Sequence, residues 1–330
     1  MERRPERLPL PQPQHAVHRH ETPRPGEKDP LARERGVRRV KPGQASRTAE
    51  YVALFRAIES ARPASSRLFH DEFAHLFLGP RMRRQFRMSQ LPILGPAVLR
   101  YYDSRAGARS AAVARTCYID DTLQSALKTG IQQVVILGAG YDCRAYRMAE
   151  LSTCRVFEVD HPATLSRKRE TLSLALGRIP DHVQQVATDF NEESFHGEMI
   201  AAGFDPAQRT FVIWEGVTGY LTAAAVDTTL RWIAAAARCG ELVFTYLHRN
   251  VLERPDAFGD LARIKRILDD SNEPWTFGFD PGELPAYLSA RGFDLLEDLG
   301  ADQFRARYLR DWPGSLRGYA FYRIAHARVR

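Results

Sequence analysis

The sequence predicts an α/β protein built on a mostly parallel β-sheet, and three observations support this. Several short runs are rich in valine, isoleucine and phenylalanine, which favour strands. A helical or loop segment long enough for a crossover separates each run from the next. The runs are almost wholly apolar, as in a sheet that helices cover on both faces. They are QVVILGAG (133–140), CRVFEVD (154–160), VQQVATDF (183–190), TFVIWEG (210–216) and ELVFTYL (241–247).

Helices and one late strand complete this pattern. The clearest crossover helices are PATLSRKRETLSLAL (162–176) and AAAVDTTLRWIAAAARCG (223–240). The last apolar run, YAFYRIAHARV (319–329), alternates between apolar and polar residues. We expect it to form a final strand that joins the sheet late and runs antiparallel.

The chain is expected to have a helical region, 46–130, before the sheet-containing core, 131–330. The residues 46–63 have apolar side chains at helical spacing, with Pro63 beyond the end. A second short helix is predicted at 71–80, closed by Gly79-Pro80, and one or two more between 91 and 130. This region would form a cap over the core.

The first 45 residues are predicted to be a disordered, basic, proline-rich tail. They hold eleven Lys/Arg, six Asp/Glu and eight of the 20 prolines, and thus +5 of the formal net charge of +7. They have no apolar period that could offset the entropy of ordering. Interleaved acids and the lack of aromatic residues weigh against a nucleic-acid-binding arm.

Composition excludes several classes of protein. No apolar run is long enough to cross a bilayer and the N-terminus has no secretory pattern, so no membrane partner and a cytoplasmic location are expected. The four cysteines, Cys117, Cys143, Cys154 and Cys239, have no metal-ligand spacing, and we expect reduced thiols and no bound metal. No particular oligomeric state is predicted.

The clearest site motif is LGAGYD, where Gly138 and Gly140 end a strand and open a helix. Glycine lets the backbone approach a ligand closely. A dinucleotide fingerprint would have a third glycine at the position of Cys143, where it helps to bind a pyrophosphate. The motif therefore favours a nucleoside cofactor without a pyrophosphate over NAD or FAD.

Asp160 closes the next strand, 22 residues after Gly138. A carboxylate at this position can accept hydrogen bonds from both hydroxyls of a ribose. Two other interpretations stay open. Glu158 could hold the ribose instead, and Asp160 could cap the helix that begins at Pro162.

Two further strand ends carry acids. Asp189 and Phe190 could accept a hydrogen bond from an adenine amino group and pack on the ring. Glu215 follows an apolar run, where a charge is costly unless it is paired, so it could face a cationic group. Together the four strand ends predict a site for S-adenosylmethionine. An NAD-dependent oxidoreductase and a non-catalytic nucleoside-binding protein are the alternatives from other classes.

In this order, the segments VVILGAGYDCRAYR, FEVDHP, TDF and WEGVTGYL resemble the leucine carboxyl methyltransferase family. The upstream segments SRTAEYVALFRAIES and VARTCYIDD also resemble it, so that the resemblance covers roughly residues 46–325. It implies the class I methyltransferase fold, which is Rossmann-like, with seven strands and an N-terminal helical cap.

The resemblance also implies a role for each cofactor-binding residue. The planar guanidinium of an arginine fits a carboxylate, so the carboxylate-binding role of Arg115 given next is chemically reasonable. By resemblance, Arg115 would bind the carboxylate of the methionine moiety, Gly138 would lie under that moiety, Asp160 would hold the ribose, Asp189 and Phe190 the adenine, and Glu215 would neutralise the ammonium.

The expected reaction is methyl transfer to an oxygen, with S-adenosylhomocysteine as the second product. A carboxylate of a polyketide-like small molecule or of a peptide C-terminus is the expected acceptor, because it is ionised at pH 7 and needs no base. A phenol of secondary metabolism is the alternative. The candidates for catalytic or substrate-facing residues are Tyr220, which follows the run at 210–216, and Tyr246, His248 and Arg249, which follow ELVFT (241–245).

Overall fold

The computed structural model describes residues 47–103, 107–188, 195–237, 239–258, 261, 274–310 and 320–330. The chain divides into two units, Met1–Arg39 and Val40–Arg330, and all of the described residues belong to the second. The tail predicted at 1–45 therefore lies outside the described residues.

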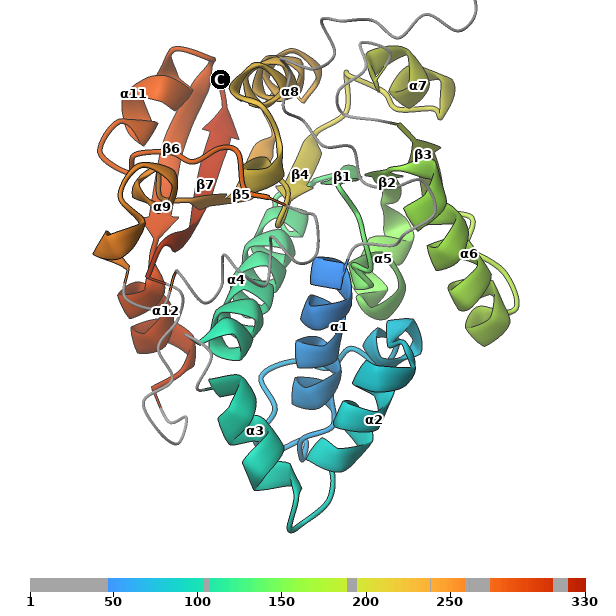
Figure 1. The fold of residues 1–330 in the computed structure, drawn as a ribbon. Helices are drawn as coiled ribbons and strands as arrows, with labels where there is room; N and C mark the ends of the chain where they lie inside the picture. The colour runs from blue at the N-terminus through green and yellow to red at the C-terminus, as the bar shows by residue number, and fades with distance from the viewer. Residues whose placement is uncertain are drawn as a thin grey trace, which may run out of the picture. The chain divides into compact units, whose positions relative to one another are not determined.

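One seven-stranded sheet with the order β3-β2-β1-β4-β5-β7-β6 forms the centre of this unit (Figure 1). The first five strands run parallel to one another, and β7 runs antiparallel between β5 and β6. The predicted fold class and the antiparallel final strand are thus confirmed. The strands are β1 (Gln133–Leu137), β2 (Arg155–Asp160), β3 (Val183–Ala187), β4 (Thr210–Trp214), β5 (Glu241–Leu247), β6 (Phe293–Leu299) and β7 (Tyr322–Val329).

The sequence pattern did not predict β6. Its sequence, FDLLEDL, holds three acids, and charged side chains are common on edge strands because they discourage pairing with other chains. A shift in register between Leu295 and Glu297 also breaks the alternation that would reveal a strand.

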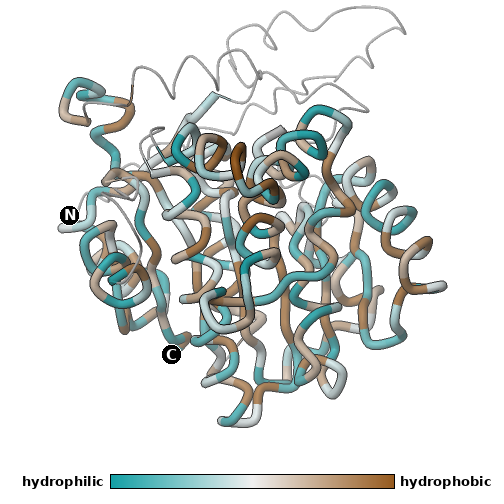
Figure 2. Tube along the Cα trace, turned by 90° about the horizontal axis from the view of Figure 1, so that it is seen from below, coloured by the Kyte–Doolittle hydropathy of each residue, from teal (hydrophilic) through white to brown (hydrophobic). Residues whose placement is uncertain are grey.

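Helices cover both faces of the sheet. Successive side chains of a strand point to opposite faces, so neighbouring apolar residues of one strand pack against different helices. Val134 and Ile136 of β1 pack toward one set of helices, and Val135 and Leu137 pack toward the other. In Figure 2 hydrophobic residues (brown) recur along segments in the interior of the trace, and many of the loops at its margin are hydrophilic (teal). The first set is α4 (Ala108–Leu127), α5 (Arg144–Arg147), η3 (Ala149–Thr153) and α12 (Ala301–Tyr308); the second is α7 (Phe195–Ala201), α8 (Ala223–Ala236) and α11 (Leu284–Ser289).

The described residues before α4 are mostly helical, as expected, and they form most of a separate apolar cluster, to which Tyr141 and Cys143 of the turn after β1 also belong. The second predicted helix is only one 3-10 turn, and Pro80 begins a helix instead of ending one. Proline suits the first helical position, because its missing N–H would have no partner there and its φ is already helical. The elements are α1 (Arg47–Ser60), η2 (Ala74–Phe77), α2 (Pro80–Ser89) and α3 (Gly95–Asp103).

Among the described residues, no helix is long and apolar enough to cross a membrane.

Further helical elements lie in the connections between the strands. The remaining helical elements are α6 (Pro162–Leu176), η4 (Thr218–Tyr220), α9 (Asn250–Glu253) and η5 (Pro255–Ala257).

A fully buried ion pair joins α6 to the sheet. The Nζ of Lys168 lies 2.7 Å from Oε1 of Glu158 on β2, and neither side chain is exposed. Tyr146 Oη and Gln185 Nε2 donate to the other oxygen of Glu158, at 2.8 and 3.1 Å. Glu158 is therefore committed to packing α6 against the sheet, which corrects its interpretation as a ribose ligand.

We expect Lys168→Met to lower the free energy of unfolding by about 3–5 kcal/mol, because it leaves a buried carboxylate without its cation. Adding Glu158→Gln should restore part of this loss, since no charge is then buried. Urea unfolding followed by circular dichroism measures both effects. A double variant as unstable as the single one would contradict a charge-based explanation.

Candidate functional site

Several of the predicted site residues lie at one edge of the sheet, where β1, β2, β4 and β5 end. Gly138, Asp160, Glu215 and His248 lie at or directly after the carboxyl ends of these four parallel strands. Ligands of open α/β sheets bind outside this edge. The structure therefore brings together the strand ends that the sequence singled out.

The turn after β1 needs glycine for two separate reasons. Gly138 and Gly140 have φ values of 66° and 44°, in the left-handed region where side chains are strained. A Cβ on Gly138 would also lie 2.2 Å from Cγ2 of Val217, in the segment after β4. The bare turn thus lets the β4 segment pack directly on it, and the backbone of Gly140 stays close to Asp160.

Asp160 holds this turn in place. Its Oδ2 accepts from the backbone N–H of Gly140 at 2.6 Å, and its Oδ1 accepts from the N–H of His161 at 2.6 Å. Burial raises the pKa of Asp160, although both N–H donors act to lower it. The N-cap of α6 is His161, whose Nδ1 accepts from Ala163, so the cap interpretation of Asp160 is wrong.

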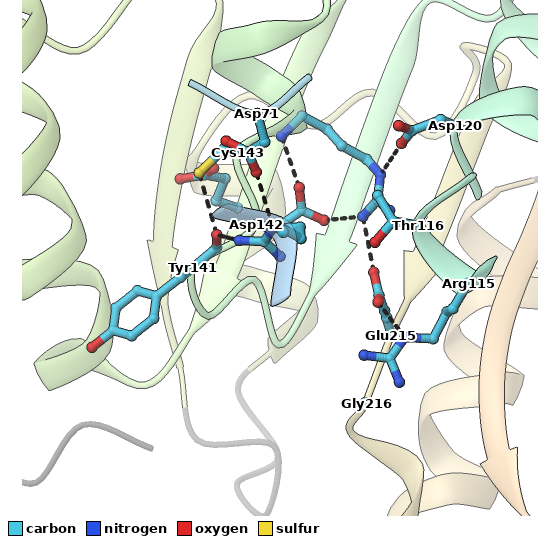
Figure 3. Close-up of polar contacts among 12 residues, drawn as sticks. Asp71, Arg115, Thr116, Asp120, Tyr141, Asp142, Cys143, Glu215 and Gly216 are labelled. Atoms are coloured by element: carbon cyan, nitrogen blue, oxygen red, sulfur yellow. Dashed lines mark hydrogen bonds and ion pairs between the residues drawn. The ribbon is translucent and has the colours of Figure 1, made fainter. Parts of the chain in front are cut away.

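Arginines and carboxylates alternate along a continuous chain of ion pairs beside the turn, and Figure 3 shows several of these contacts, among them the pair of Glu215 with Arg115. The chain joins α1, the segment before η2, α4, α5 and the residue after β4. The pairs are Arg56–Asp71 (2.9 Å), Asp71–Arg147 (3.9 Å), Arg147–Asp120 (2.7 Å), Asp120–Arg144 (2.7 Å), Arg144–Glu215 (2.9 Å) and Glu215–Arg115 (2.5 Å).

Asp142 also pairs with Arg144, and we call these eight side chains the ionic network. Four arginines face four carboxylates, so the network carries no formal net charge. Its side chains are at most 12% exposed. Buried charges are tolerated when each is paired, and removal of one partner is strongly destabilising.

Burial and pairing act in opposite directions on these acids. Burial alone would raise the pKa of Asp142, but Arg144 and other nearby cations lower it to about 2. Burial would also raise the pKa of Glu215, and Arg115 and Arg144 outweigh it, so that this pKa falls below its ordinary value. Both acids are thus held ionised inside the protein.

Arg115 lies at the end of the network with part of its guanidinium unused. Only Nε contacts Glu215, while its two terminal nitrogens make no hydrogen bond or ion pair within the described residues. Figure 3 shows them pointing away from Glu215. The guanidinium carbon also lies 5.1 Å from the ring centre of Tyr322 at the start of β7. A guanidinium in this state can bind a further carboxylate.

Thr188 is a site residue that the sequence reasoning missed. It follows β3, is only 4% exposed, and its Oγ1 has no hydrogen-bond partner in the part of the chain described here. A buried hydroxyl without a partner is costly, and this one could bond a ligand. Its neighbours Asp189 and Phe190, which were expected to hold an adenine, lie outside the described residues.

The four substrate-facing candidates occupy different surroundings. Tyr246 is 1% exposed and belongs to the core on the α8 side, where its hydroxyl donates to Asp298 at 2.8 Å. The guanidinium of Arg249 pairs with Glu283 at 2.5 Å on the surface. The structure therefore places neither of these functional groups at the end of the ionic network, because both are used in pairs elsewhere.

The other two candidates remain at the edge of the sheet. Tyr220 closes η4, shortly after Glu215. His248 follows β5, and its Nδ1 accepts from the N–H of Asn250 at 3.1 Å. Burial and nearby arginines lower the pKa of His248, so its ring is neutral at pH 7.

An apolar cluster lies beside His248 and Tyr322. The ring of Phe258 contacts both His248 and Phe321, at 5.8 and 5.7 Å between centroids, and Trp275 lies 5.5 Å from Phe321. Tyr322 Oη in turn lies 3.1 Å from Oγ1 of Thr245, which accepts from the N–H of Gly216. The cluster consists of Leu247, Val251, Phe258, Leu261, Trp275, Phe321 and Tyr322.

Sequence signals existed for only part of this site. Asp142, Arg144 and Arg147 stand in the quoted motif GAGYDCRAYR, where charged residues directly after an apolar strand indicate a paired cluster. Tyr322 and Thr188 gave no signal, because single aromatic or hydroxyl residues at strand ends are common. Among the described residues, no group of His, Cys, Asp or Glu could hold a metal ion.

The sheet order, the antiparallel β7 and the acids at the carboxyl edge define a methyltransferase of class I fold. The chain belongs to the leucine carboxyl methyltransferase family, whose sequence profile matches residues 49–234. The resemblance found in the sequence motifs is thus confirmed.

Known proteins agree with this assignment. A protein of Frankia alni, named as a candidate S-adenosyl-L-methionine-dependent methyltransferase, is 36% identical over 66% of this chain and 73% of its own length. A similarly named protein of Streptomyces avermitilis is 35% identical over 66% and 74%. The crystal structure of a candidate methyltransferase from Thermobifida fusca superposes with a TM-score of 0.55 and 18% identity, covering 88% of this chain and 97% of that one.

We expect the stabilising effect of Asp142 to disappear in acid. Its folded pKa of about 2 lies below the ordinary value of 3.8, so its contribution is complete above about pH 4 and is lost as the pH falls toward 2. Asp142→Asn should lower the free energy of unfolding at pH 7 by on the order of 2 kcal/mol, and the difference from the wild type should shrink below pH 4. Urea unfolding at several pH values measures this.

The exposed residue Asp181, which pairs with Arg178, provides a matched control. Asp181→Asn should change stability little at any pH, because exposed pairs contribute little. A difference between wild type and Asp142→Asn that is the same at pH 3 and pH 7 would contradict the network's electrostatic role.

Proposed function

We propose that this chain transfers the methyl group of S-adenosylmethionine to a carboxylate oxygen, giving a methyl ester and S-adenosylhomocysteine. The chain is an S-adenosylmethionine-dependent methyltransferase, as its curated relatives are named. Different observations support the identity of the cofactor and the identity of the acceptor. The identity of the acceptor is the more specific part of the proposal.

The residues present fit the methionine end of the cofactor. The free terminal nitrogens of Arg115 match its carboxylate, and Glu215, held ionised by Arg115 and Arg144, matches its ammonium. The cofactor brings an activated sulfonium methyl group. This chain's contribution is therefore to bind the cofactor, orient it and exclude water.

The nucleoside end would bind along β2 and β3. Each carboxylate oxygen of Asp160 accepts one backbone N–H, and a remaining lone pair of the carboxylate could accept from a ribose hydroxyl. Thr188, whose hydroxyl has no hydrogen-bond partner among the described residues, directly precedes in the sequence Asp189 and Phe190, the residues proposed for the adenine. We therefore assign the ribose to Asp160 and add Thr188 to the adenine side.

His248 supplies the observation that carries the choice of acceptor. Its Nδ1 accepts from Asn250, so a neutral ring carries its proton on Nε2. This nitrogen can donate a hydrogen bond but cannot take a proton from a phenol. A carboxylate needs no base, and its second oxygen could accept from Nε2. The tautomer therefore favours a carboxylate over a phenol.

The apolar cluster supports the same choice. A carboxylate is a weak nucleophile in water because hydration stabilises its charge. Phe258, Trp275 and Phe321 offer a wall that would exclude water from an acceptor held near Tyr322. The description of the family, leucine carboxyl methyltransferase, also names a carboxyl acceptor. The size of the acceptor stays open to a small molecule or a peptide C-terminus.

We expect Asp160→Ala to weaken S-adenosylmethionine binding by roughly 10- to 150-fold, as for the loss of hydrogen bonds to a charged group. The same change should lower the free energy of unfolding by about 1–3 kcal/mol, because the N–H groups of Gly140 and His161 lose their acceptor. Isothermal titration calorimetry and urea unfolding measure the two effects. An unchanged affinity would limit Asp160 to fixing the turn.

The acceptor is tested by the stability of the transferred methyl group. The protein is incubated with radioactive S-adenosylmethionine and a panel of small aromatic acids and peptides with free C-termini. Methyl esters release volatile methanol in mild alkali, whereas phenolic ethers and methylamines do not. We expect base-labile label. Base-stable label would exclude the carboxylate and make His248→Gln the next variant to assay for lost phenol methylation.

A further inference from the structure

The connection between α2 and α3 is an exposed apolar tip. Leu91, Pro92, Ile93 and Leu94 are consecutive and all exposed, and Ile93 is 88% exposed. Tyr101, near the other end of α3, adds a further large exposed ring. Folded proteins rarely leave a run of this kind in water unless it contacts something.

The tip has a defined conformation of its own. The N–H of Gly95 donates to Leu91 O at 2.7 Å, and the N–H of Val98 donates to Leu94 O at 3.1 Å. The hydroxyl of Tyr102 donates to Oε1 of Gln85 at 2.7 Å and ties α3 to α2. The turn thus satisfies its own backbone and holds the apolar side chains outward, so a partner would meet side chains rather than an open strand edge.

Arginines surround the base of the tip without any acid. Between Gly79 and Tyr102 the sequence has five arginines and no Asp or Glu. All five are exposed, and within the described residues none of them forms an ion pair. Like charges three or four residues apart destabilise a helix, so this arrangement is unfavourable unless an anionic partner neutralises it. The arginines are Arg81, Arg83, Arg84, Arg87 and Arg100.

The spacing of these charges fits the surface of a bilayer. Figure 1 shows α2 and α3 converging on their connecting loop at the lower edge of the view. With a rise of about 1.5 Å per residue, Arg87, Arg84 and Arg83 lie roughly 3–9 Å behind the end of α2. This matches the depth of the headgroup layer, about 5–8 Å on each side of the hydrocarbon core.

The charges also spread around the helix. At 3.6 residues per turn, the four arginines of α2 cover about 160° of its circumference. A single protein groove would contact a narrower stripe, whereas headgroups surround an inserted tip on all sides. The tip also projects outward, since its central side chain is almost fully exposed, and a projecting aliphatic tip fits a fluid hydrocarbon layer.

We propose that the tip, residues 81–101, docks this protein on anionic lipid bilayers, with Ile93 and Leu94 inserted among the acyl chains and the arginines on the headgroup phosphates. This replaces the expectation of no membrane partner, which considered only segments that span. The proposal concerns a peripheral contact, and it does not depend on which acceptor is methylated.

Co-sedimentation of the full chain with vesicles tests the proposal. Phosphatidylcholine vesicles are compared with vesicles that also contain phosphatidylserine, at low and high salt. We expect binding only to the anionic vesicles, weakened by salt because charges contribute. Ile93→Asp should weaken the partition at least about tenfold, and Arg84→Gln with Arg87→Gln about fivefold for each charge removed.

Matched controls separate the tip from general surface effects. Leu174 on α6 is 84% exposed, and Leu174→Asp should bind vesicles like the wild type. Arg178→Gln removes an exposed arginine outside the tip and should also have only a small effect. The tail at 1–45 is present in every variant, so its basic charge contributes equally to all of them. Thermal unfolding confirms that each variant folds.

Three outcomes would overturn the proposal. Absence of binding to anionic vesicles would exclude the lipid surface. Equal binding by Ile93→Asp and the wild type would move the contact away from the tip. If the wild type fails to bind vesicles but forms dimers that Ile93→Asp dissociates in analytical ultracentrifugation, the tip contacts a second copy of the chain. A blue shift of Ile93→Trp fluorescence on anionic vesicles would support insertion directly.

Discussion

The pairing of Glu215 with Arg144 and Arg115 is the interaction on which the rest of the site depends. A carboxylate at the end of a buried strand is stable only if cations accompany it. Those cations need further carboxylates, and the requirement extends through Asp120 to Arg147 and beyond. The result is a network in which the charges of the arginines and carboxylates cancel, and each charged side chain is needed to neutralise its neighbours.

This network also places the helices before β1 on the sheet. Arg56 of α1 pairs with Asp71 and donates to the carbonyl of Tyr141 in the turn after β1. The ring of Tyr141 stacks on Phe77 at 4.5 Å between centroids. The helical region therefore contacts the glycine-containing turn through one charged and one aromatic interaction, and it is fixed by the same residues that shape the proposed cofactor site.

The sequence was a good guide where periodicity and strand ends carry the information. The five parallel strands, the late antiparallel strand and the positions of Asp160 and Glu215 at strand ends were predicted from local pattern alone. The local sequence pattern failed to predict features that depend on contacts between residues far apart in the sequence. β6 is charged and irregular, and it is a strand only because β7 pairs with it. The surroundings of Tyr246 depend on Asp298, which is 52 residues away, so no local signal could show that its hydroxyl is already bonded.

The position of β7 affects how the protein can be assembled. This strand is last in the chain order of the described strands, yet it lies between β5 and β6 and carries Tyr322 to the side of Arg115. While the polypeptide emerges from the ribosome, β5 has no neighbour on that side until residues 322–329 appear. The apolar strand β5 is exposed throughout this time. The sheet therefore cannot close before residues 322–329 have been made, and a nascent chain with all of its site carboxylates in place would still lack one wall of the proposed site.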